Sequence, residues 1–354
     1  LIRSFLHTYQ NFYYRDSSHP LGSGIYNTEN KYTGYRNGQW GPLKSVGSIN
    51  NEQGQPTWEG QPTISSDGNL MVFSSARLSS TPRGKGDDET FTLDLFYTLK
   101  DENGRWGPPK NLGPLVNTKG QEKTPFLHTD SKTLYFASDG HPGIGGYDIY
   151  YTRMDKNGNW IKPKNIGYPI NTDKDEHGLI VSTDGQTGIF STRRQGTRGL
   201  DLCSFELPES LQPDDVTIVK GEVGWPLPDG DFTVNIEYVQ SKTVEQVHVS
   251  REDGKFAHVV RTGGLDDVVM TIEGESTGYQ SVVIHDKESP SRSAVTVDLT
   301  PDEEVVKSGA FELKDVQFAT KKSELNSRCE VILRALANHL ERHKELALNI
   351  AGHT

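Results

Sequence analysis

One pentapeptide of this chain has the pattern of a nucleophile-bearing turn. Residues Gly274-Glu275-Ser276-Thr277-Gly278 match G-x-S-x-G, which presents the catalytic serine in α/β-hydrolases. That turn must follow a strand and open a helix, with Asp and His supplied by the same fold. Here a strand-like segment, residues 280–285, follows instead. We therefore predict an ordinary turn and no catalytic serine.

Three aspartates, Asp67, Asp130 and Asp184, recur beside Ser/Thr/Gly turn sequences. Two carboxylates facing each other across a cleft can hydrolyse a glycoside, so a glycosidase stands as the alternative function. An aspartate beside a turn, however, commonly accepts hydrogen bonds from its own backbone. We predict this structural role. Two further acidic segments, DENG (101–104) and DKNG (155–158), lack the remaining ligands of a calcium loop and are predicted to be hairpin turns.

Two histidines, His339 and His343, are four residues apart, a spacing that can hold zinc on a helix. A zinc site needs at least a third protein ligand, and the sequence around this pair offers none. We expect no metal and no cofactor. The chain is thus predicted not to be an enzyme, with a ligand-binding module as a further alternative.

Composition narrows the classes of partner. The 354 residues carry a formal net charge of -11, mean hydropathy is -0.64, and no basic cluster is visible. Nucleic acid is therefore not an expected partner. No run approaches the ~20 apolar residues of a membrane helix, so we expect no transmembrane segment in this chain.

Residues 1–206 repeat one pattern four times. The clearest copies are residues 60–98, 122–152 and 175–206. Each has an extended segment, a turn, a second strand ending in Phe and two small residues, a glycine-rich loop, and a strand that begins with Asp. The aspartates Asp94, Asp148 and Asp201 are 54 and 53 residues apart. A period of this length with short strands favours the blades of a β-propeller.

An earlier copy of the repeat occupies the N-terminal end. Residues 5–8 (FLHT) repeat residues 126–129, and Ile25-Tyr26 is matched to Ile149-Tyr150. Between copies run linking segments with Asn-Gly and Trp, residues 36–50, 102–118 and 156–172. The units resemble TolB-like propeller repeats through PTISSDG (62–68), the Phe73-Ser74-Ser75 strand and the Asp94-Leu95-Phe96 strand. We expect the propeller to be N-terminally incomplete here.

Strict alternation of apolar and polar residues begins at Val216. About seven short strands between residues 216 and 300, with turns such as Asp253-Gly254, predict an antiparallel β-sandwich. Lys220-Gly221-Glu222-Val223 and Asp253-Gly254-Lys255-Phe256 resemble the carboxypeptidase regulatory-like domain. That resemblance implies an accessory fold without catalytic residues.

The pattern changes to a helical one near the C-terminus. Leu325, Cys329, Leu333, Leu336 and Leu340 form one apolar stripe at helical spacing. Residues 311–354, with DVQFATKKSEL (315–325) and ALNIAGHT (347–354), resemble the start of an OmpA-like peptidoglycan-binding domain, truncated here. The family then places an Asp directly after Gly-His-Thr, and with a later Arg this Asp binds diaminopimelate. We expect this chain to stop before that pair.

The resemblance implies a site and a setting. The peptidoglycan-binding residues would be Phe318, Ala319, Thr320, Lys321, Gly352, His353 and Thr354. Ala319 departs from the family, which often has an acidic residue there. The expected fold is mainly β: a β-propeller (1–206), an antiparallel β-sandwich (216–300) and a partial α/β OmpA-like domain (311–354). Together these modules resemble OmpA-family multidomain periplasmic proteins of Bacteroidota, including a component of the type IX secretion system.

From this family we expect a periplasmic scaffold associated with the outer membrane, lipid-anchored through a segment before Leu1. Its partners would be peptidoglycan and other secretion-system or outer-membrane proteins.

Overall fold

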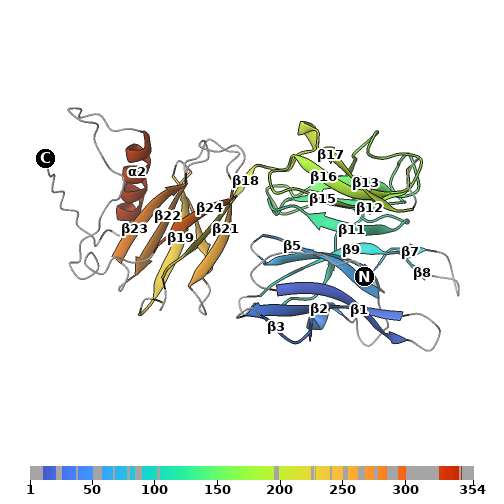
Figure 1. Cartoon of the computed structure of the whole chain (residues 1–354), viewed down its shortest axis with the longest axis horizontal. Helices are drawn as coiled ribbons and strands as arrows, with labels where there is room; N and C mark the ends of the chain where they lie inside the picture. The colour runs from blue at the N-terminus through green and yellow to red at the C-terminus, as the bar shows by residue number, and fades with distance from the viewer. Residues whose placement is uncertain are drawn as a thin grey trace. The chain divides into compact units, whose positions relative to one another are not determined.

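The chain folds mainly into β-strands, most of which pair antiparallel (Figure 1). The computed structural model describes residues 11–20, 26–36, 39–50, 58–66, 68–77, 80–83, 90–101, 104–194, 199–224, 227, 229–239, 241–249, 254–261, 268–274, 278–284, 294–299, 327–342 and 344. The chain divides into two compact units, the first ending at Asp215 and the second beginning at Val216. Within the described residues, no helix has the length and apolarity of a membrane span.

The first unit contains the strands of the sequence repeats. Their bounds are β1 Asn11–Pro20, β2 Tyr26–Arg36, β3 Gln39–Trp40, β4 Lys44–Ser45, β5 Trp58–Ile64, β6 Leu70–Ala76, β7 Pro82–Arg83, β8 Thr90–Phe91, β9 Asp94–Leu99, β10 Lys110–Asn111, β11 Glu122–Leu127, β12 Thr133–Ser138, β13 Asp148–Arg153, β14 Lys164–Asn165, β15 Glu176–Val181, β16 Thr187–Thr192 and β17 Asp201–Glu206. Short 3-10 turns cover Gly47–Ile49 and Glu209–Leu211.

The last two repeats each form a small antiparallel sheet of their own. The second repeat has the order β11-β12-β13-β14, and the third has β15-β16-β17. Strands β5, β6, β9 and β10 form the first complete repeat and lie next to one another in a larger sheet of the order β1-β2-β5-β6-β9-β10. The small hairpin β7-β8 lies between β6 and β9 in the chain. The central strand β12 is buried at all six positions, because both faces of its sheet are covered.

Successive sheets of the first unit pack face to face through two apolar clusters. Val72 and Leu95 of one sheet meet Leu127, Leu134 and Phe136 of the next. The following interface uses equivalent positions, listed here from both sheets: Tyr135, Ile149 and Tyr151 against Leu179, Val181 and Phe190. One face of each sheet thus covers the opposite face of its neighbour.

The register of the N-terminal strands corrects the sequence alignment. β1 and β2 pair with Arg15 opposite Asn30, as β12 and β13 pair with Ala137 opposite Ile149. Asn50 binds the backbone of Asn30 as Asn171 binds that of Ile149, so Asn30 occupies the position of Ile149. The match of Ile25 to Ile149 was therefore wrong by five residues. The match rested on apolar similarity, whereas the true equivalent is polar. β2 also joins the next sheet through one parallel pair, Thr28 with Trp58.

The second unit is a sandwich of two sheets around a shared core. Its strands are β18 Val216–Glu222, β19 Phe232–Tyr238, β20 Thr243–Val247, β21 Lys255–Arg261, β22 Val268–Gly274, β23 Gly278–Ile284 and β24 Ala294–Asp298. The sheets have the orders β21-β18-β24 and β20-β19-β22-β23. As the alternation predicts, Val234, Ile236 and Met270 are buried between them.

One strand pair of the sandwich differs from the antiparallel prediction. β18 and β24 run parallel, with Ile218 opposite Ala294 and Glu222 opposite Asp298. Alternation of apolar and polar residues reports which face is buried, and it is the same for both strand directions. The direction of β24 was therefore not encoded in the pattern that predicted the strand.

Helix α2 (Ser327–Arg342) packs on the outer face of the four-stranded sheet. Its Ile332 and Ala335 contact Val239, Val269 and Val283. The buried stripe differs from the predicted one, since Cys329, Ile332, Ala335 and Leu336 are buried while Leu333 and Leu340 are half-buried. The helix is turned about its own axis so that Ile332 and Ala335, rather than Leu333 and Leu340, face the sheet.

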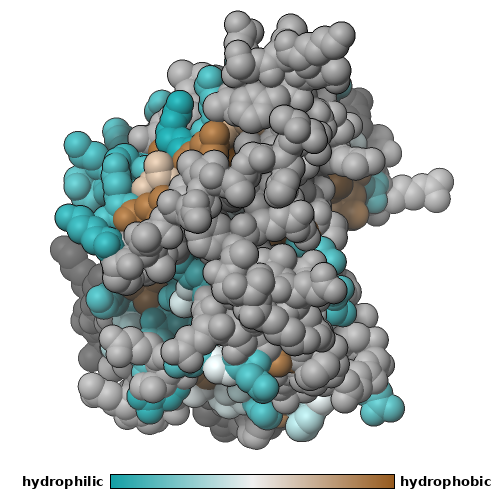
Figure 2. All heavy atoms as spheres, turned by 90° about the vertical axis from the view of Figure 1, so that its left-hand side faces the viewer, coloured by the Kyte–Doolittle hydropathy of each residue, from teal (hydrophilic) through white to brown (hydrophobic). Residues whose placement is uncertain are grey.

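Polar contacts fix α2 at its C-terminal half. The buried Asn338 side chain donates a hydrogen bond of 2.5 Å to Glu237, and Lys242 pairs with Glu341 at 2.9 Å. Glu330, Arg334 and Glu341 are exposed. Among the residues that Figure 2 colours, most are hydrophilic, with small apolar areas between them.

Candidate functional site

The most conspicuous ionisable groups of the first unit are three buried glutamates. Glu59, Glu122 and Glu176 each begin or nearly begin the first strand of a repeat, and each is fully buried. Each stands opposite a small hydroxyl residue on the second strand: Ser75, Ser138 and Thr192. The hydroxyls donate to the carboxylates at 3.1, 2.7 and 2.9 Å respectively.

In the second and third repeats a preceding threonine completes the binding of the glutamate. Thr118 donates from its backbone N–H at 3.0 Å and from its hydroxyl at 2.7 Å to Glu122. Thr172 donates to Glu176 in the same way, at 2.9 and 2.5 Å. These bonds join the linking segment to the first strand of the repeat that follows it. Glu122 and Glu176 thus stabilise the packing of the linking segment on the repeat.

Two of the three glutamates lie beside an arginine. Arg77 is 3.0 Å from Glu59, and Arg194 is 4.0 Å from Glu176. Both arginines also donate to a backbone carbonyl of the linking segment, Arg77 to Ile49 and Arg194 to Ile170. Each of these two repeats therefore places one cation between the carboxylate and the preceding linker.

The second repeat has no arginine at this position. Gly140 stands where the others have Arg77 and Arg194, two residues after the strand hydroxyl. A Cβ on Gly140 would lie 2.7 Å from the backbone nitrogen of Gly120, so no side chain fits. The neighbouring His141 binds the carbonyl of Val116 instead, at 2.8 Å. Burial raises the pKa of Glu122 to about 7, and its hydrogen bonds offset only part of this effect.

The aspartates that begin the third strands hold the glycine-rich loops. Asp94 accepts hydrogen bonds from the backbone and hydroxyl of Thr81, at 2.9 and 3.0 Å, and from Asn111 at 2.9 Å. Asp148 accepts from the backbone of Ile144 and Gly145. The recurring Asp is therefore part of the framework in these two repeats.

Asparagines at the ends of the linking segments form hydrogen bonds with the backbone of the third strands. Asn171 accepts from the Ile149 N–H and donates to the Ile149 carbonyl, both at 2.8 Å. Asn117 binds Leu95 in the same two-bond manner, and Asn50 binds Asn30. Sequence reasoning missed these residues, although the repeated Asn at the end of each linking segment was a usable signal.

The turn aspartates behave as the sequence predicted where the structure describes them. Asp130 accepts from the backbone of Lys132 and Thr133, at 2.9 and 2.8 Å. Asp184 accepts from Gln186 at 3.1 Å, and Asp67 lies outside the described residues. Asp155 binds the backbone of Asn157 and Asn159 in a tight turn, as predicted for the DKNG segment.

The buried carboxylates are poorly placed for turnover. A glycosidase needs an acid and a base or nucleophile on either side of a bound sugar. Asp94 and Glu122 lie close enough for the charge of Asp94 to raise the Glu122 pKa slightly, but both are fully buried. Their acceptor atoms bind donors of their own unit. This arrangement stabilises the repeats.

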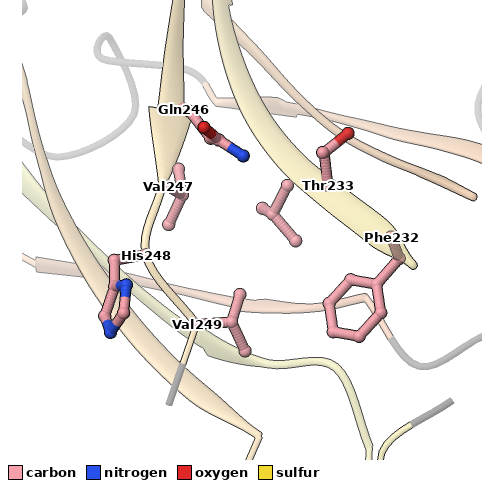
Figure 3. A pocket seen from close by; sticks show the side chains of 7 residues that line it. Phe232, Thr233, Gln246, Val247, His248 and Val249 are labelled. Carbon is pink, nitrogen blue, oxygen red and sulfur yellow. The ribbon is translucent and has the colours of Figure 1, made fainter. Parts of the chain in front are cut away.

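A pocket of about 290 Å³ lies in the sandwich between the start of β19 and the end of β20 (Figure 3). It is lined by Phe232, Thr233, Val234, Gln246, Val247, His248 and Val249. Phe232, Val234, Val247 and Val249 are its apolar residues, and Thr233, Gln246 and His248 are its polar ones. Sequence reasoning did not identify this pocket.

The remaining sequence candidates divide between described and undescribed residues. Gly274 ends β22 and is paired with Gly278, which begins β23, so the G-x-S-x-G segment joins two strands and not a strand and a helix. The predicted peptidoglycan-binding residues Phe318, Ala319, Thr320, Lys321, Gly352, His353 and Thr354 lie outside the described residues. So does His343. Among described residues, no three His, Cys, Asp or Glu side chains are grouped to hold a metal.

Comparisons with known proteins give no family. No protein-family model matches the chain, and no curated protein matches it. An α-L-arabinofuranosidase from Lactobacillus brevis is 9% identical with a TM-score of 0.34, over 69% of this chain and 70% of the enzyme. The hydrazine synthase of Kuenenia stuttgartiensis is 9% identical with a TM-score of 0.37, over 78% of this chain and 44% of that protein.

A sialidase of Trypanosoma rangeli is 11% identical with a TM-score of 0.30, over 75% of this chain and 50% of the sialidase. At these TM-scores the likenesses carry no argument about the function of this chain.

Proposed function

We propose that this protein is a non-enzymatic scaffold of the bacterial periplasm that links an outer-membrane-associated complex to peptidoglycan. The stacked repeat sheets would be blades of a β-propeller that, with the sandwich, presents surfaces to partner proteins. The C-terminal segment would belong to an OmpA-like domain that binds the cell wall.

The observation that carries the proposal is that the recurring acidic residues accept hydrogen bonds from the framework of the repeats. Glu122 and Glu176 each bind three donors from their own repeat, and Asp94 and Asp148 bind the loops that precede them. Repeated buried carboxylates that stabilise a framework fit a protein selected for its surfaces. An active site would leave at least one such group facing a cavity.

The order of the modules supports the location. Propeller-like repeats, a regulatory-like sandwich and an OmpA-like start resemble the PorE component of the type IX secretion system. By this analogy the complex would be a secretion complex, and a lipid anchor would hold the protein at the outer membrane.

Co-sedimentation of the natural full-length protein with purified peptidoglycan sacculi tests the anchor. We expect the protein to sediment with sacculi and to be released by free diaminopimelate but not by lysine. Lys321→Ala and His353→Ala should reduce the sedimented fraction, whereas Lys344→Ala, at an exposed position, should not. Sedimentation that neither the two variants nor diaminopimelate changes would remove the anchoring role.

The glycosidase alternative is tested on the same material. The supernatant is analysed for muropeptides or sugars released from the sacculi. Release that disappears in Glu122→Gln or Asp148→Asn would favour an enzyme and overturn the scaffold proposal. We expect no release from the wild-type protein or from either variant.

A further inference from the structure

Lys123 and His177 occupy equivalent positions on two neighbouring strands, β11 and β15. Each follows the buried glutamate of its repeat by one residue, and β11 and β15 contact one another. The next residues of the two strands are hydrogen-bonded, because the Gly178 N–H donates to the Thr124 hydroxyl at 3.1 Å. Lys123 and His177 therefore lie side by side where the second repeat meets the third.

A β-bulge follows each of these two residues. The strand pairing shifts register directly after Lys123 and directly after His177. The bulged residues Thr124 and Gly178 have φ angles of 50° and 71°. A bulge changes the direction of the side chains beside it, and bulges are common next to functional sites. The local backbone thus gives Lys123 and His177 a direction that a regular strand would not give them.

Of the three repeats, the second alone has both a lysine and an aromatic ring at this junction. Gly60 stands at the Lys123 position in the first repeat, and Leu93 and Leu200 stand at the Tyr147 position in the other two. A role in the repeated framework would recur in every repeat, as the role of the buried glutamates does. Lys123 and Tyr147 are therefore not part of that framework.

The Lys123 ammonium lies against an aromatic ring. Its Nζ is 3.3 Å from the centre of the Tyr147 ring, and no ion pair or hydrogen bond joins it to another described residue. The side chain is half-buried, and this burial lowers the pKa of Lys123, while the charges of Asp175 and Asp139 raise it. The three N–H donors of a partly enclosed ammonium can thus bind an acceptor from outside the chain.

The His177 imidazole lies close to the same ring, with 6.4 Å between the centres of the His177 and Tyr147 rings. Its Nδ1 is enclosed and has no hydrogen-bond partner among the described residues. Such an enclosed polar atom is rare in folded proteins. Burial lowers the pKa of His177, and the charge of Lys123 lowers it further, so the ring is neutral at pH 7. Nε2 is then the ring nitrogen that a ligand can meet.

The charged groups around this pair favour a singly charged anion. Asp175 accepts a hydrogen bond from the Tyr147 N–H at 3.0 Å, and Asp139 accepts one from the Gln121 N–H at 2.5 Å. Both aspartates are exposed, as is Arg193, which lies near enough to His177 to lower its pKa. The two aspartates balance the lysine and the arginine, so a dianion such as phosphate would be opposed more strongly than a carboxylate.

We propose that Lys123 and His177 bind the carboxylate group of a ligand at the junction of β11 and β15. The Lys123 ammonium donates a charge-assisted hydrogen bond to the carboxylate, and the His177 imidazole lies beside it as the second donor. The Tyr147 ring supplies an apolar wall for the carbon atoms of the ligand. This site is separate from the peptidoglycan-binding segment and does not depend on the proposed scaffold role.

NMR spectroscopy of the 354-residue chain with ¹³C-labelled histidine tests this proposal, with N-acetylglycine as the probe. The His177→Gln variant assigns the His177 signal. We expect N-acetylglycine to shift this signal and to raise the pKa of His177, because a bound carboxylate stabilises the imidazolium. Lys123→Met should weaken the binding at least ~10-fold, since the charge-assisted hydrogen bond is lost. In the free protein the same substitution should raise the pKa of His177.

Lys164→Met is the matched control, because Lys164 is an exposed lysine on β14 of the same repeat. This variant should bind N-acetylglycine as the wild type does. Circular dichroism checks the fold of each variant, and Lys123→Gln replaces Lys123→Met if the latter does not fold. An unshifted His177 signal at millimolar N-acetylglycine, or unchanged affinity in the Lys123 variant, would overturn the proposal. An equal response to the neutral N-acetylglycinamide, or tighter binding of inorganic phosphate, would overturn it as well.

Discussion

Glu122 is expected to make the stability of the second repeat depend on pH. Its pKa rises from 4.5 to about 7 on folding, chiefly because the carboxyl is buried. The folded state therefore binds this proton more tightly than the unfolded state. The resulting stabilisation is complete below about pH 4.5 and is lost as pH rises through 7. The difference between the two pKa values corresponds to about 3 kcal/mol.

Glu122→Gln removes the ionisation and keeps most of the shape. We expect the variant to be more stable than the wild type by about 2 kcal/mol at pH 8, because no buried charge forms. At pH 5 the stability of the variant should differ from that of the wild type by no more than about 1 kcal/mol, because the wild-type carboxyl is then protonated and carries no charge. The assay is hydrogen exchange in increasing urea, read on peptides from β12 and β13 after correction for the intrinsic effect of pH.

Glu176→Gln is the matched control, because Arg194 lies 4.0 Å from this carboxylate. Loss of the Glu176 carboxylate leaves the partly buried Arg194 with one charged partner fewer. This variant should therefore be less stable than the wild type at pH 8. The reasoning is refuted if Glu122→Gln loses stability at pH 8, or if the wild-type second repeat is as stable at pH 8 as at pH 5.

Three further changes are expected to weaken defined contacts. Asn171→Ala should cost about 2–4 kcal/mol in hydrogen exchange of β13, because the buried N–H and C=O of Ile149 lose their bonds. Gly140→Ala should destabilise the second repeat by at least about 1–3 kcal/mol in urea unfolding, since its Cβ would meet Gly120. Ala335→Asp should detach α2 and raise exchange in β23, because a carboxylate would be buried against valines.

Exposed neighbours provide controls for these three variants. Lys164→Ala lies in the same linking segment as Asn171, Lys174→Ala lies just after that segment, and Glu330→Ala lies in α2. Each should change stability by less than about 0.5 kcal/mol. A Gly140→Ala protein as stable as the wild type would contradict the close packing of the two glycines. Unchanged exchange in β23 of the Ala335→Asp variant would contradict the docking of the helix.

The repeats were predictable because their strands and turns obey local rules. Strand alternation and the positions of Asp94 and Asp148 follow from spacing alone, and the turn role of Asp130 follows from its own neighbours. The buried glutamates were not predicted, because a Glu at a strand end has the same sequence appearance whether it is solvated or enclosed. What encloses Glu122 is Thr118 and Ser138, which only the folded register brings together.

The position of α2 shows a second limit. A helical stripe predicts that one face is buried, but it does not specify the surface that covers it. The sequence grouped this helix with the OmpA-like segment, whereas its Ile332 and Ala335 lie on the sandwich. Asn338 offered a hint, since a polar residue within the stripe needs a partner, and Glu237 supplies it from the sheet.

The docking of α2 has a mechanical consequence. A pull on the chain beyond Arg342 strains the helix–sheet contact before it reaches the paired strands of the sandwich. That contact consists of one small apolar cluster, one buried hydrogen bond and an exposed ion pair, so it gives way at a lower force than β18 and β24. The helix thus yields first while the sandwich stays folded.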